Sequence, residues 1–578
     1  MRKIFLPFFL FLLCINGFSQ KKEETAVDKM LQAIDGFQQR ENRRDSVLHH
    51  PLGSNSEEDF LRRYTFYDSA YTALNKIDTA SLDFDAQINL ELIKYDVEDQ
   101  LSEWKFKSYL NPILSDEGFH TEIAGMGSQV LTTLKEYENY IQRLKDIPRS
   151  VEERLNLMRK GLALGICQPR AILNGYENTY EQHIVTNLEK SVFWKPFLKK
   201  PFAISDTDWK RITIQGRLAV QQYAIEGFKT IKTFFDKEYL PKTRKTIGVS
   251  SFPDGLAYYQ ERTHHYTTTD LSYEEVYQLG LQEVERIKKE MWQVLQEAKF
   301  GGDLKAFIAY LRTDPKFYAP TADQLLKEAS YIAKKSDGML PQFFGKLPRQ
   351  PYGVEPVPAH LAPTYTAGRY AGAPLNSKRA GNYWVNVYDL KSRPLYALES
   401  LTLHEAVPGH HLQIALTKEL NDLPPFRRNL YVNAFGEGWG LYAEYLGTEM
   451  GFYKNPYSHF GRLTYEMWRA CRLVLDVALH TKGWTREQAV AYLSENTALS
   501  LHEVNTEINR YISWPGQALA YKMGELTIKE LRKKAEEELK DKFDVREFHD
   551  LVLSQGTVTL KVLERMVNRF IEAKKSKQ

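Results

Sequence analysis

Histidine and glutamate residues with the spacing of a metal site occur in the stretch LHEAVPGHHLQ. Two histidines four residues apart share one face of a helix and can hold one zinc ion, with a glutamate beside the first as general base. Here His404 is followed by Glu405, as in such sites. Pro408 replaces the expected second histidine, and His410 and His411 come later. The stretch predicts an interrupted zinc site or, alternatively, a core helix that contains histidine.

A regular helix could not bring these histidines to one metal ion. Between His404 and His410 a helix turns by about 240° and advances by about 9 Å, so the two rings would point apart. His411 returns to the same face, but about 10.5 Å along the axis, too far for zinc–nitrogen bonds of about 2.1 Å. Pro408 interrupts helical hydrogen bonding, and Gly409 permits unusual backbone angles. We therefore expect a bulge that absorbs two residues and brings in His410, or one that absorbs three and brings in His411.

A zinc ion that does chemistry needs a third protein ligand and an open position for water. The predicted helix AFGEGWGLYAEYLG offers Glu437, and Glu444 lies two turns farther along the same face. The neighbours of Glu437 are apolar, and an unpaired carboxylate is costly in such surroundings. We predict one zinc per chain, held by His404, His410 and Glu437. Glu444 would orient a ligand histidine, and Glu405 would act as the general base.

The three motifs HEAVPGHHLQ, FGEGWGLYAE and RYISWPGQALAYKMG resemble, in this order, the bacterial domain-of-unknown-function family 885. The order of motifs covers nearly the whole chain after its first twenty residues. That family is similar to gluzincin zinc metallopeptidases, namely the thimet oligopeptidase and carboxypeptidase Taq groups. Those groups carry H-E-F-G-H and a later helix with two glutamates seven residues apart. In this chain Val407 and Pro408 are the two inserted residues. The resemblance implies a zincin-like fold and peptide hydrolysis.

The resemblance also implies further site residues. In the related groups a tyrosine from a late helix donates to the oxyanion of the tetrahedral intermediate, and Tyr521 matches that position; the alternative is a core tyrosine. Lys522 and Arg510 are candidates to bind a substrate carboxylate or to stabilise the charge of the oxyanion, with surface ion pairs as the alternative. The stretch NYWVNVYDL matches the edge strand of zincins, to which an extended peptide can add. Tyr383 and Asn386 are therefore candidate substrate contacts, unless this strand only packs against helices.

Most of the remaining chain has helical periodicity. Capping boxes begin at Ser272 and Thr485, and Asn455 is the expected N-cap of a helix that starts with proline. Only residues 348–393 are dense in proline and glycine and then alternate like a short strand. We therefore predict a mainly α protein, a large helical zincin-like domain with a small β-sheet beside the active-site helix.

No internal repeat or low-complexity linker marks a domain boundary. We predict a single metallopeptidase-like domain over residues 20–578, with its motif core at 380–525. The hydrophobic content of 43% is that of a globular protein. The net charge is only +3, which argues against nucleic acid as the main partner.

The N-terminal end has the composition of a secretory signal peptide. A basic start, an apolar run and small residues predict removal of residues 1–19 by cleavage after Ser19. Lipid attachment at Cys14 is the less favoured alternative, because bulky leucines precede it. No later segment has about 18 uninterrupted apolar residues, so we predict an exported, periplasmic or secreted protein without a membrane span. We expect Cys167 and Cys471 to be two buried thiols, with a disulfide between them as the alternative.

These inferences predict an exported zinc-dependent peptidase that cleaves short peptides by a metal-activated water. The runner-up is a metal-dependent hydrolase of a non-peptide amide or ester. A peptide-binding protein that has lost turnover is disfavoured, because Glu405 is present. A helical protein without metal is disfavoured too, because three motifs together supply ligands, base and oxyanion donor.

Overall fold

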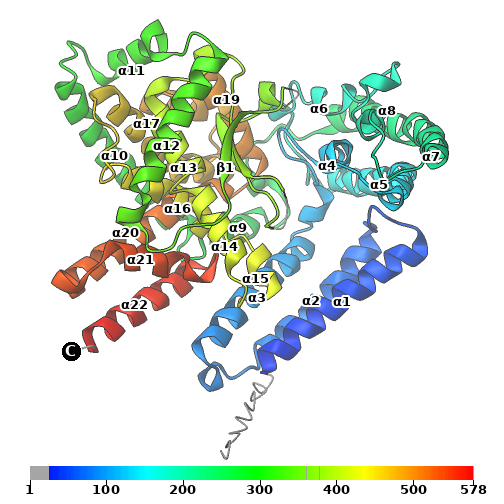
Figure 1. The fold of residues 1–578 in the computed structure, drawn as a ribbon, viewed down its shortest axis with the longest axis horizontal. Helices are drawn as coiled ribbons and strands as arrows, with labels where there is room; N and C mark the ends of the chain where they lie inside the picture. The colour runs from blue at the N-terminus through cyan, green and yellow to red at the C-terminus, as the bar shows by residue number, and fades with distance from the viewer. Residues whose placement is uncertain (1–24, 360, 376–377, 577–578) are drawn as a thin grey trace, which may run out of the picture.

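The computed structural model describes residues 25–359, 361–375 and 378–576, so the predictions for residues 1–19 and Cys14 lie outside the described part. The protein is mainly α-helical with one small sheet, as predicted (Figure 1). The N-terminal helices are α1 (Ala26–Leu48), α2 (Glu57–Leu74), α3 (Phe84–Lys105), α4 (Phe119–Gly125), α5 (Leu134–Leu164), α6 (Asn178–Glu181), α7 (Asp206–Ala219), α8 (Ile225–Phe234) and α9 (Gly255–Thr267).

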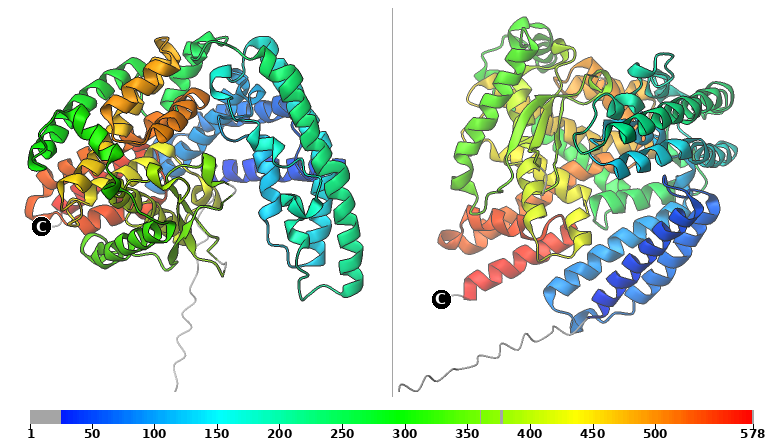
Figure 2. Two further views of the ribbon diagram at one scale, coloured as in Figure 1. Left: turned by 90° about the horizontal axis from the view of Figure 1, so that it is seen from above. Right: turned by 45° about the vertical axis from the view of Figure 1, so that its right-hand side comes forward.

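The remaining helices form the part of the chain that carries the motifs. They are α10 (Tyr273–Glu297), α11 (Leu304–Thr313), α12 (Ala322–Phe343), α13 (Leu398–Glu405), α14 (His410–Glu419), α15 (Pro425–Asn429), α16 (Asn433–Leu446), α17 (Pro456–Thr481), α18 (Arg486–Asn496), α19 (Leu501–Ser513), α20 (Ala520–Leu539), α21 (Val545–Val552) and α22 (Leu560–Ser576). Seen from above, the chain forms an arch, with α4–α8 on one side and this group on the other (Figure 2).

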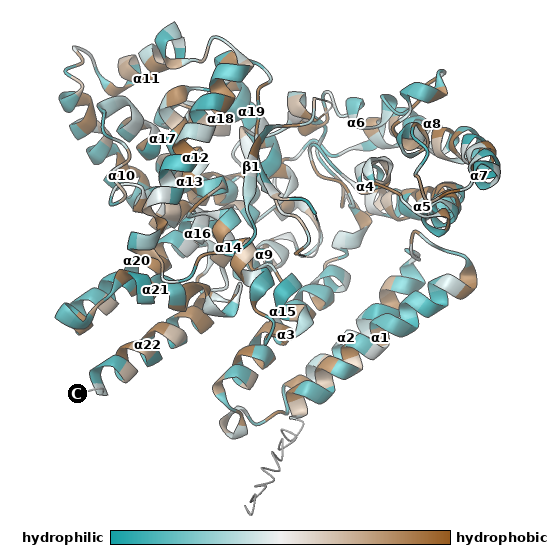
Figure 3. Ribbon diagram, in the orientation of Figure 1, coloured by the Kyte–Doolittle hydropathy of each residue, from teal (hydrophilic) through white to brown (hydrophobic). Residues whose placement is uncertain are grey.

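The helix boundaries follow the local signals in the sequence. Ser272 and Thr485 accept hydrogen bonds in the capping boxes that open α10 and α18, and Asn455 caps α17, whose first residue is proline. In outer helices such as α1 and α2, apolar residues are interspersed with polar ones along the helix, as in helices with one buried face (Figure 3). Within the described residues, no helix is both long and apolar enough to cross a membrane.

Two glycines bring α16 and α20 into backbone contact. A Cβ built at Gly438 would lie 2.4 Å from the Cα of Gly524, and a Cβ at Gly524 would lie 1.8 Å from the carbonyl oxygen of Ala434. No side chain fits between the two backbones. The glycines of FGEGWG and AYKMG therefore place the helix of Glu437 directly against the helix of Tyr521.

The sheet has three strands, β1 (Tyr352–Pro356), β2 (Gly368–Ala371) and β3 (Gly381–Val385), in the order β1-β3-β2. β1 runs parallel to β3, and β2 runs antiparallel to it. The prediction that NYWVNVYDL forms an edge strand is therefore wrong, because β3 is central. β2 packs against α13.

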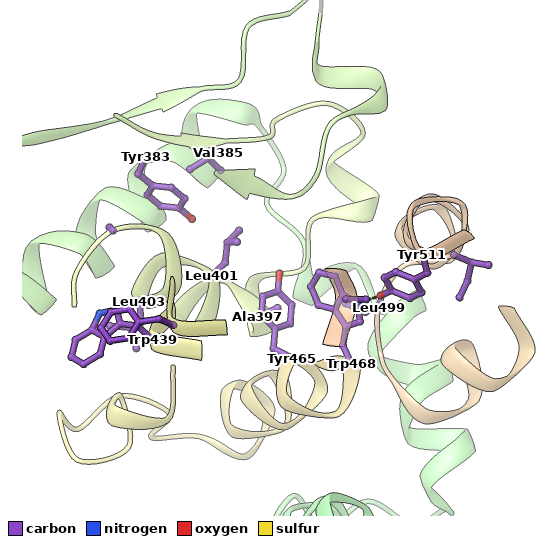
Figure 4. Packing of buried hydrophobic residues seen from close by; sticks show 14 of the residues in the cluster. Tyr383, Val385, Ala397, Leu401, Leu403, Trp439, Tyr465, Trp468, Leu499 and Tyr511 are labelled. Atoms are coloured by element: carbon purple, nitrogen blue, oxygen red, sulfur yellow. Dashed lines mark hydrogen bonds between the residues drawn. The ribbon is translucent and has the colours of Figure 1, made fainter. Parts of the chain in front are cut away.

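One continuous core supports the sheet and the motif helices. Its buried apolar side chains extend from Ile88 to Ile571, whereas α1 and α2 pack around a smaller core that includes Val27, Phe37 and Tyr67. Figure 4 shows part of it, with the ring of Tyr383 pointing from β3 into the interior. Cys167 and Cys471 are buried and unpaired with one another, as predicted.

Candidate metal centre

The helix that carries His404 stops just after this residue instead of bulging. α13 ends at Glu405, and α14 begins anew at His410. The turn between them includes a cis peptide bond between Val407 and Pro408. The carbonyl oxygen of Pro408 accepts a hydrogen bond of 2.8 Å from Trp439 Nε1. A side chain at Gly409 is excluded, because its Cβ would lie 1.9 Å from the carbonyl oxygen of His404. The expected bulge is thus a full break between two helices.

This break brings three possible metal ligands together. The ligand atoms of His404, His410 and Glu437 all lie within 4.8 Å of one another. Glu437 Oε2 is 3.7 Å from His404 Nε2 and 3.4 Å from His410 Nε2. Ligands at about 2.1 Å from a tetrahedral zinc ion are about 3.4 Å apart. The trio therefore fits zinc in donor type, in number and in spacing, and the three protein donors leave a fourth position for water.

The second ring nitrogen of each histidine has a partner of its own. His404 Nδ1 lies 2.8 Å from Glu444 Oε1, which also receives Arg469 Nη2 at 3.3 Å. His410 Nδ1 lies 3.3 Å from Gln413 Oε1. Such outer partners fix the tautomer that presents Nε2 to a metal ion. Glu444 is placed as predicted, whereas Gln413 was missed, although it follows His410 by one helical turn.

The charges of the trio are mutually dependent. Burial lowers the pKa of His404, but the carboxylates of Glu437 and Glu444 on either side of its ring outweigh burial and raise the pKa to about 10. Burial raises the pKa of Glu437, but the charge of His410 and the nearby ring of His404 hold it well below its usual range. Glu437 is therefore anionic, as a metal ligand must be.

We expect Glu444→Gln to weaken zinc binding by about 10- to 100-fold, because the amide removes the negative charge that orients His404 and increases its basicity. Competition with a coloured chelator measures this affinity. The matched control is Glu449→Gln, since Glu449 lies shortly after α16 and pairs with Arg532 at 2.9 Å. Equal zinc affinity of Glu444→Gln and the control would show that Glu444 has no role at the metal.

Tyr431 is a site residue that the sequence reasoning missed. Its hydroxyl donates to Glu437 Oε1 at 3.2 Å, while Oε2 of the same carboxylate faces the histidines. Gly436 makes room for the tyrosine ring, because a Cβ there would lie 2.3 Å from Tyr431 Cζ. Tyr431 is 37% exposed, so it covers the site from the solvent side. No spacing rule points to it, because it precedes α16 in an irregular loop.

We expect Tyr431→Phe to lower zinc affinity by about 10-fold, since Glu437 loses the partner that holds its outer oxygen. The phenylalanine ring keeps the packing on Gly436, so the change isolates the hydroxyl. The absorption spectrum of the cobalt-substituted protein should change as well, because a freed Oε1 can become a second ligand atom. An unchanged affinity and spectrum would rule out this role of Tyr431.

His411 does not belong to the trio, so the alternative in which it replaces His410 is wrong. Its Nδ1 lies 3.0 Å from the hydroxyl of Tyr370, and its ring packs against Tyr352 with centroids 4.5 Å apart. Burial lowers the pKa of His411 to about 4. It is a neutral packing residue between α14 and the sheet.

The predicted general base lies at the end of α13. Glu405 Oε2 accepts a hydrogen bond of 2.8 Å from the backbone nitrogen of Tyr370 in β2. The carboxylate of Glu405 is among the charges that raise the pKa values of His404 and Tyr431. β2 therefore holds Glu405 beside the trio, with its second oxygen not engaged by any described residue.

Tyr521, the predicted oxyanion donor, lies beside two arginines. Its hydroxyl is 3.4 Å from Arg510 Nη2, and the guanidinium of Arg472 lies 4.1 Å from its ring centroid. Tyr521 is also among the groups that raise the pKa of Tyr431, the tyrosine whose hydroxyl donates to Glu437. Arg510 and Tyr521 are thus adjacent.

Three predicted substrate contacts are wrong because the side chains are inaccessible. Lys522 is fully buried, and its Nζ pairs with three carboxylates at 2.7 to 3.0 Å. Tyr383 is fully buried, with its hydroxyl 3.3 Å from Thr402 Oγ1. The amide of Asn386 is buried and donates to three carbonyl oxygens of the loop between β1 and β2. All three residues build the framework of the site.

The chain is similar to a bacterial family and to two solved structures. The family model "Bacterial protein of unknown function (DUF885)" matches residues 39–567. The crystal structure of a candidate lipoprotein from Colwellia psychrerythraea has a TM-score of 0.86 at 28% identity, covering 95% of this chain and 100% of that chain. A candidate lipoprotein of unknown function from Shewanella oneidensis shares the fold, with a TM-score of 0.68 at 18% identity, covering 94% and 100%. No curated protein matches.

Proposed function

The chain belongs to the DUF885 family of bacterial proteins of unknown function, and we propose that it is a zinc-dependent peptidase that cleaves short peptides. One observation carries the proposal. Two histidine nitrogens and one carboxylate oxygen converge within 4.8 Å, with a glutamate of the same helix beside them. The resemblance to gluzincin peptidases supports the assignment of the reaction, because the order of ligand, base and second ligand is the same apart from the two inserted residues.

The proposal assigns a residue to each catalytic task. Zinc bound by the trio would polarise the scissile carbonyl and lower the pKa of a water molecule. Glu405 accepts the proton of the attacking water and passes it to the leaving amine. Tyr521 donates its hydroxyl hydrogen to the developing oxyanion, and the charge of Arg510 beside it adds electrostatic stabilisation.

The proposal is tested by metal-dependent cleavage of a mixed peptide library, with products identified by mass spectrometry. We expect cleavage by the zinc-loaded protein, loss after treatment with a chelator, and recovery when zinc is returned. Cleavage of amide or ester substrates but of no peptide would favour the runner-up, a hydrolase of non-peptide substrates. Binding of peptides without cleavage would favour an inactive peptide-binding protein.

We also propose that the protein is exported and attached to a lipid at Cys14. Two similar structures are those of candidate lipoproteins, which reverses the preference for cleavage after Ser19. The mass of the N-terminal peptide from the native host decides between the two. A diacylated peptide that begins at Cys14 is expected, and an unmodified peptide that begins at Gln20 would contradict it.

A further inference from the structure

A small buried cavity lies beside the first half of α13, and none of the three candidate metal ligands lines it. Its volume is about 20 Å³. A buried water molecule needs roughly 10–15 Å³, and sites for organic ligands have about 300 Å³ or more, so the cavity suits one atom-sized guest. Figure 4 shows five of its wall residues, which are Val385 in β3, Ala397 and Leu401 at α13, Tyr465 in α17, and Leu499 before α19.

Arg393 is the one basic residue in the described wall of this cavity. It is only 6% exposed, and its Nε and Nη2 atoms are buried without a hydrogen-bond partner. These two nitrogens form one edge of the guanidinium plane, so their hydrogens point the same way as a fork. Arg393 forms no ion pair with a carboxylate in the described part of the chain. A buried cation with unpaired donors is costly, so this fork requires an acceptor.

A second unpartnered donor lines the same cavity. Thr464 of α17 is fully buried, and its hydroxyl has no hydrogen-bond partner among the described residues. Other buried threonines donate to the carbonyl oxygen one helical turn earlier, as Thr417 does to Gln413 at 2.9 Å. The first turn of α13 adds the positive end of a helix dipole, since its N-cap, Ala397, provides no side-chain cap. Donors and positive charge together favour an anion.

Glu503 is the one acid in the described wall of the cavity. Its charged and titratable neighbours lie before α13, in α17 and in α19, and they are Arg393, Tyr396, Tyr465, Arg469, Arg472 and Glu507. Burial raises the pKa of Glu503 to about 7, although the charge of Arg393 lowers it. Burial keeps the two phenols neutral. Below its pKa the carboxyl is uncharged, and above it the carboxylate repels an anion.

We propose that this cavity binds one small monovalent anion, such as chloride, between the guanidinium fork of Arg393 and the hydroxyl of Thr464. The anion neutralises the buried guanidinium and ties the segment before α13 to α17. Its affinity rises as the pH falls, because an ionised Glu503 must take up a proton when the anion binds. Neither zinc nor turnover enters this binding, so it is independent of the proposed peptidase function. The competing guest is a water molecule that bridges Arg393 and Glu503.

Thermal unfolding of the purified protein tests the site, with sodium chloride exchanged stepwise for sodium gluconate at constant ionic strength. Gluconate is too large for a cavity of about 20 Å³. An anion that binds only the folded protein raises Tm in a saturable way, and the chloride concentration at half-saturation gives the apparent affinity. The series is measured below and above the pKa of Glu503. We expect a saturable rise in the wild type that is larger at the lower pH.

Four variants locate the effect. Arg393→Met should abolish the saturable rise, because it removes the fork. Thr464→Val keeps the shape of the side chain and should weaken chloride binding by about 10-fold or more, the contribution of one hydrogen bond to a charged group. Glu503→Gln should bind chloride equally well at both pH values, because the amide does not ionise. Arg43→Met, at an exposed position on α1, should behave as the wild type.

The same Tm in chloride and gluconate at both pH values in the wild type would overturn the anion site and favour the bridging water. A saturable rise that survives in Arg393→Met would place the anion elsewhere and overturn the site as well. If Arg393→Met does not fold, the other two cavity variants decide. Wild-type chloride affinity in Thr464→Val, or wild-type pH dependence in Glu503→Gln, would then contradict the site. All variants share any general effect of the two salts, so the differences between them report the cavity.

Discussion

Replacing Glu405 with glutamine should lower the rate of peptide hydrolysis by about 100- to 10,000-fold, the contribution of a general base. Glutamine keeps the size of the side chain and can still accept the hydrogen bond from Tyr370 N, which is 2.8 Å long in the wild type. It cannot take a proton from water. The zinc content should therefore stay at the wild-type level, because Glu405 is not one of the three ligands.

The measurement is kcat/KM on a cleaved library peptide, with zinc content and thermal unfolding determined on the same sample. The Glu449→Gln control described above changes a glutamate to glutamine without touching the site. Activity of Glu405→Gln within about threefold of the wild type would exclude Glu405 as the base. Loss of zinc together with activity would instead mark Glu405 as a ligand.

Gly440→Ala should strongly weaken zinc binding, although residue 440 carries no chemistry. Gly440 faces the ring of His404, and a Cβ there would lie 2.6 Å from Cε1 and 2.8 Å from Nε2. The methyl group must push the ring away from Glu437 and His410. We expect zinc affinity to fall by about 100-fold or more, at the upper end of what misoriented ligands cost.

Stability should change much less than zinc affinity. Overpacking lowers the free energy of unfolding by about 1–3 kcal/mol, and the higher helix propensity of alanine over glycine offsets about 1 kcal/mol of this loss. The matched control is Gly338→Ala in α12, where a Cβ meets no atom within 4 Å. It should stabilise the protein slightly and leave zinc affinity unchanged. Wild-type zinc affinity in Gly440→Ala would mean that His404 does not bind the metal through this orientation.

The parts of the structure that were predictable rest on local chemistry. Ser272, Asn455 and Thr485 mark helix starts because their side chains satisfy backbone groups only a few residues away. The convergence of the three candidate ligands was predictable because metal sites need few residue types, and because Pro408 forbids the one geometry that would have separated His404 from His410.

The errors concern contacts between distant segments. The resemblance to zincins predicted an edge position for the strand of Tyr383, yet β1 and β2 pair with both of its sides. Lys522 looks like a surface charge, but α10 and α17 supply Glu283 and Glu466 to bury it. The sequence did not point to Tyr431, because its hydrogen bond to Glu437 depends on how the loop before α16 packs on Gly436. Such contacts follow from the packing of the whole chain, which no local pattern encodes.

The central claim is a zinc ion held by His404, His410 and Glu437, and the metal content of four purified proteins tests it most directly. They are the wild type, His410→Ala, His411→Ala and Glu437→Ala, each loaded with zinc and dialysed. We predict about one zinc per chain in the wild type and in His411→Ala, and almost none in His410→Ala and Glu437→Ala. No zinc in the wild type, or loss in His411→Ala with retention in His410→Ala, would contradict the account.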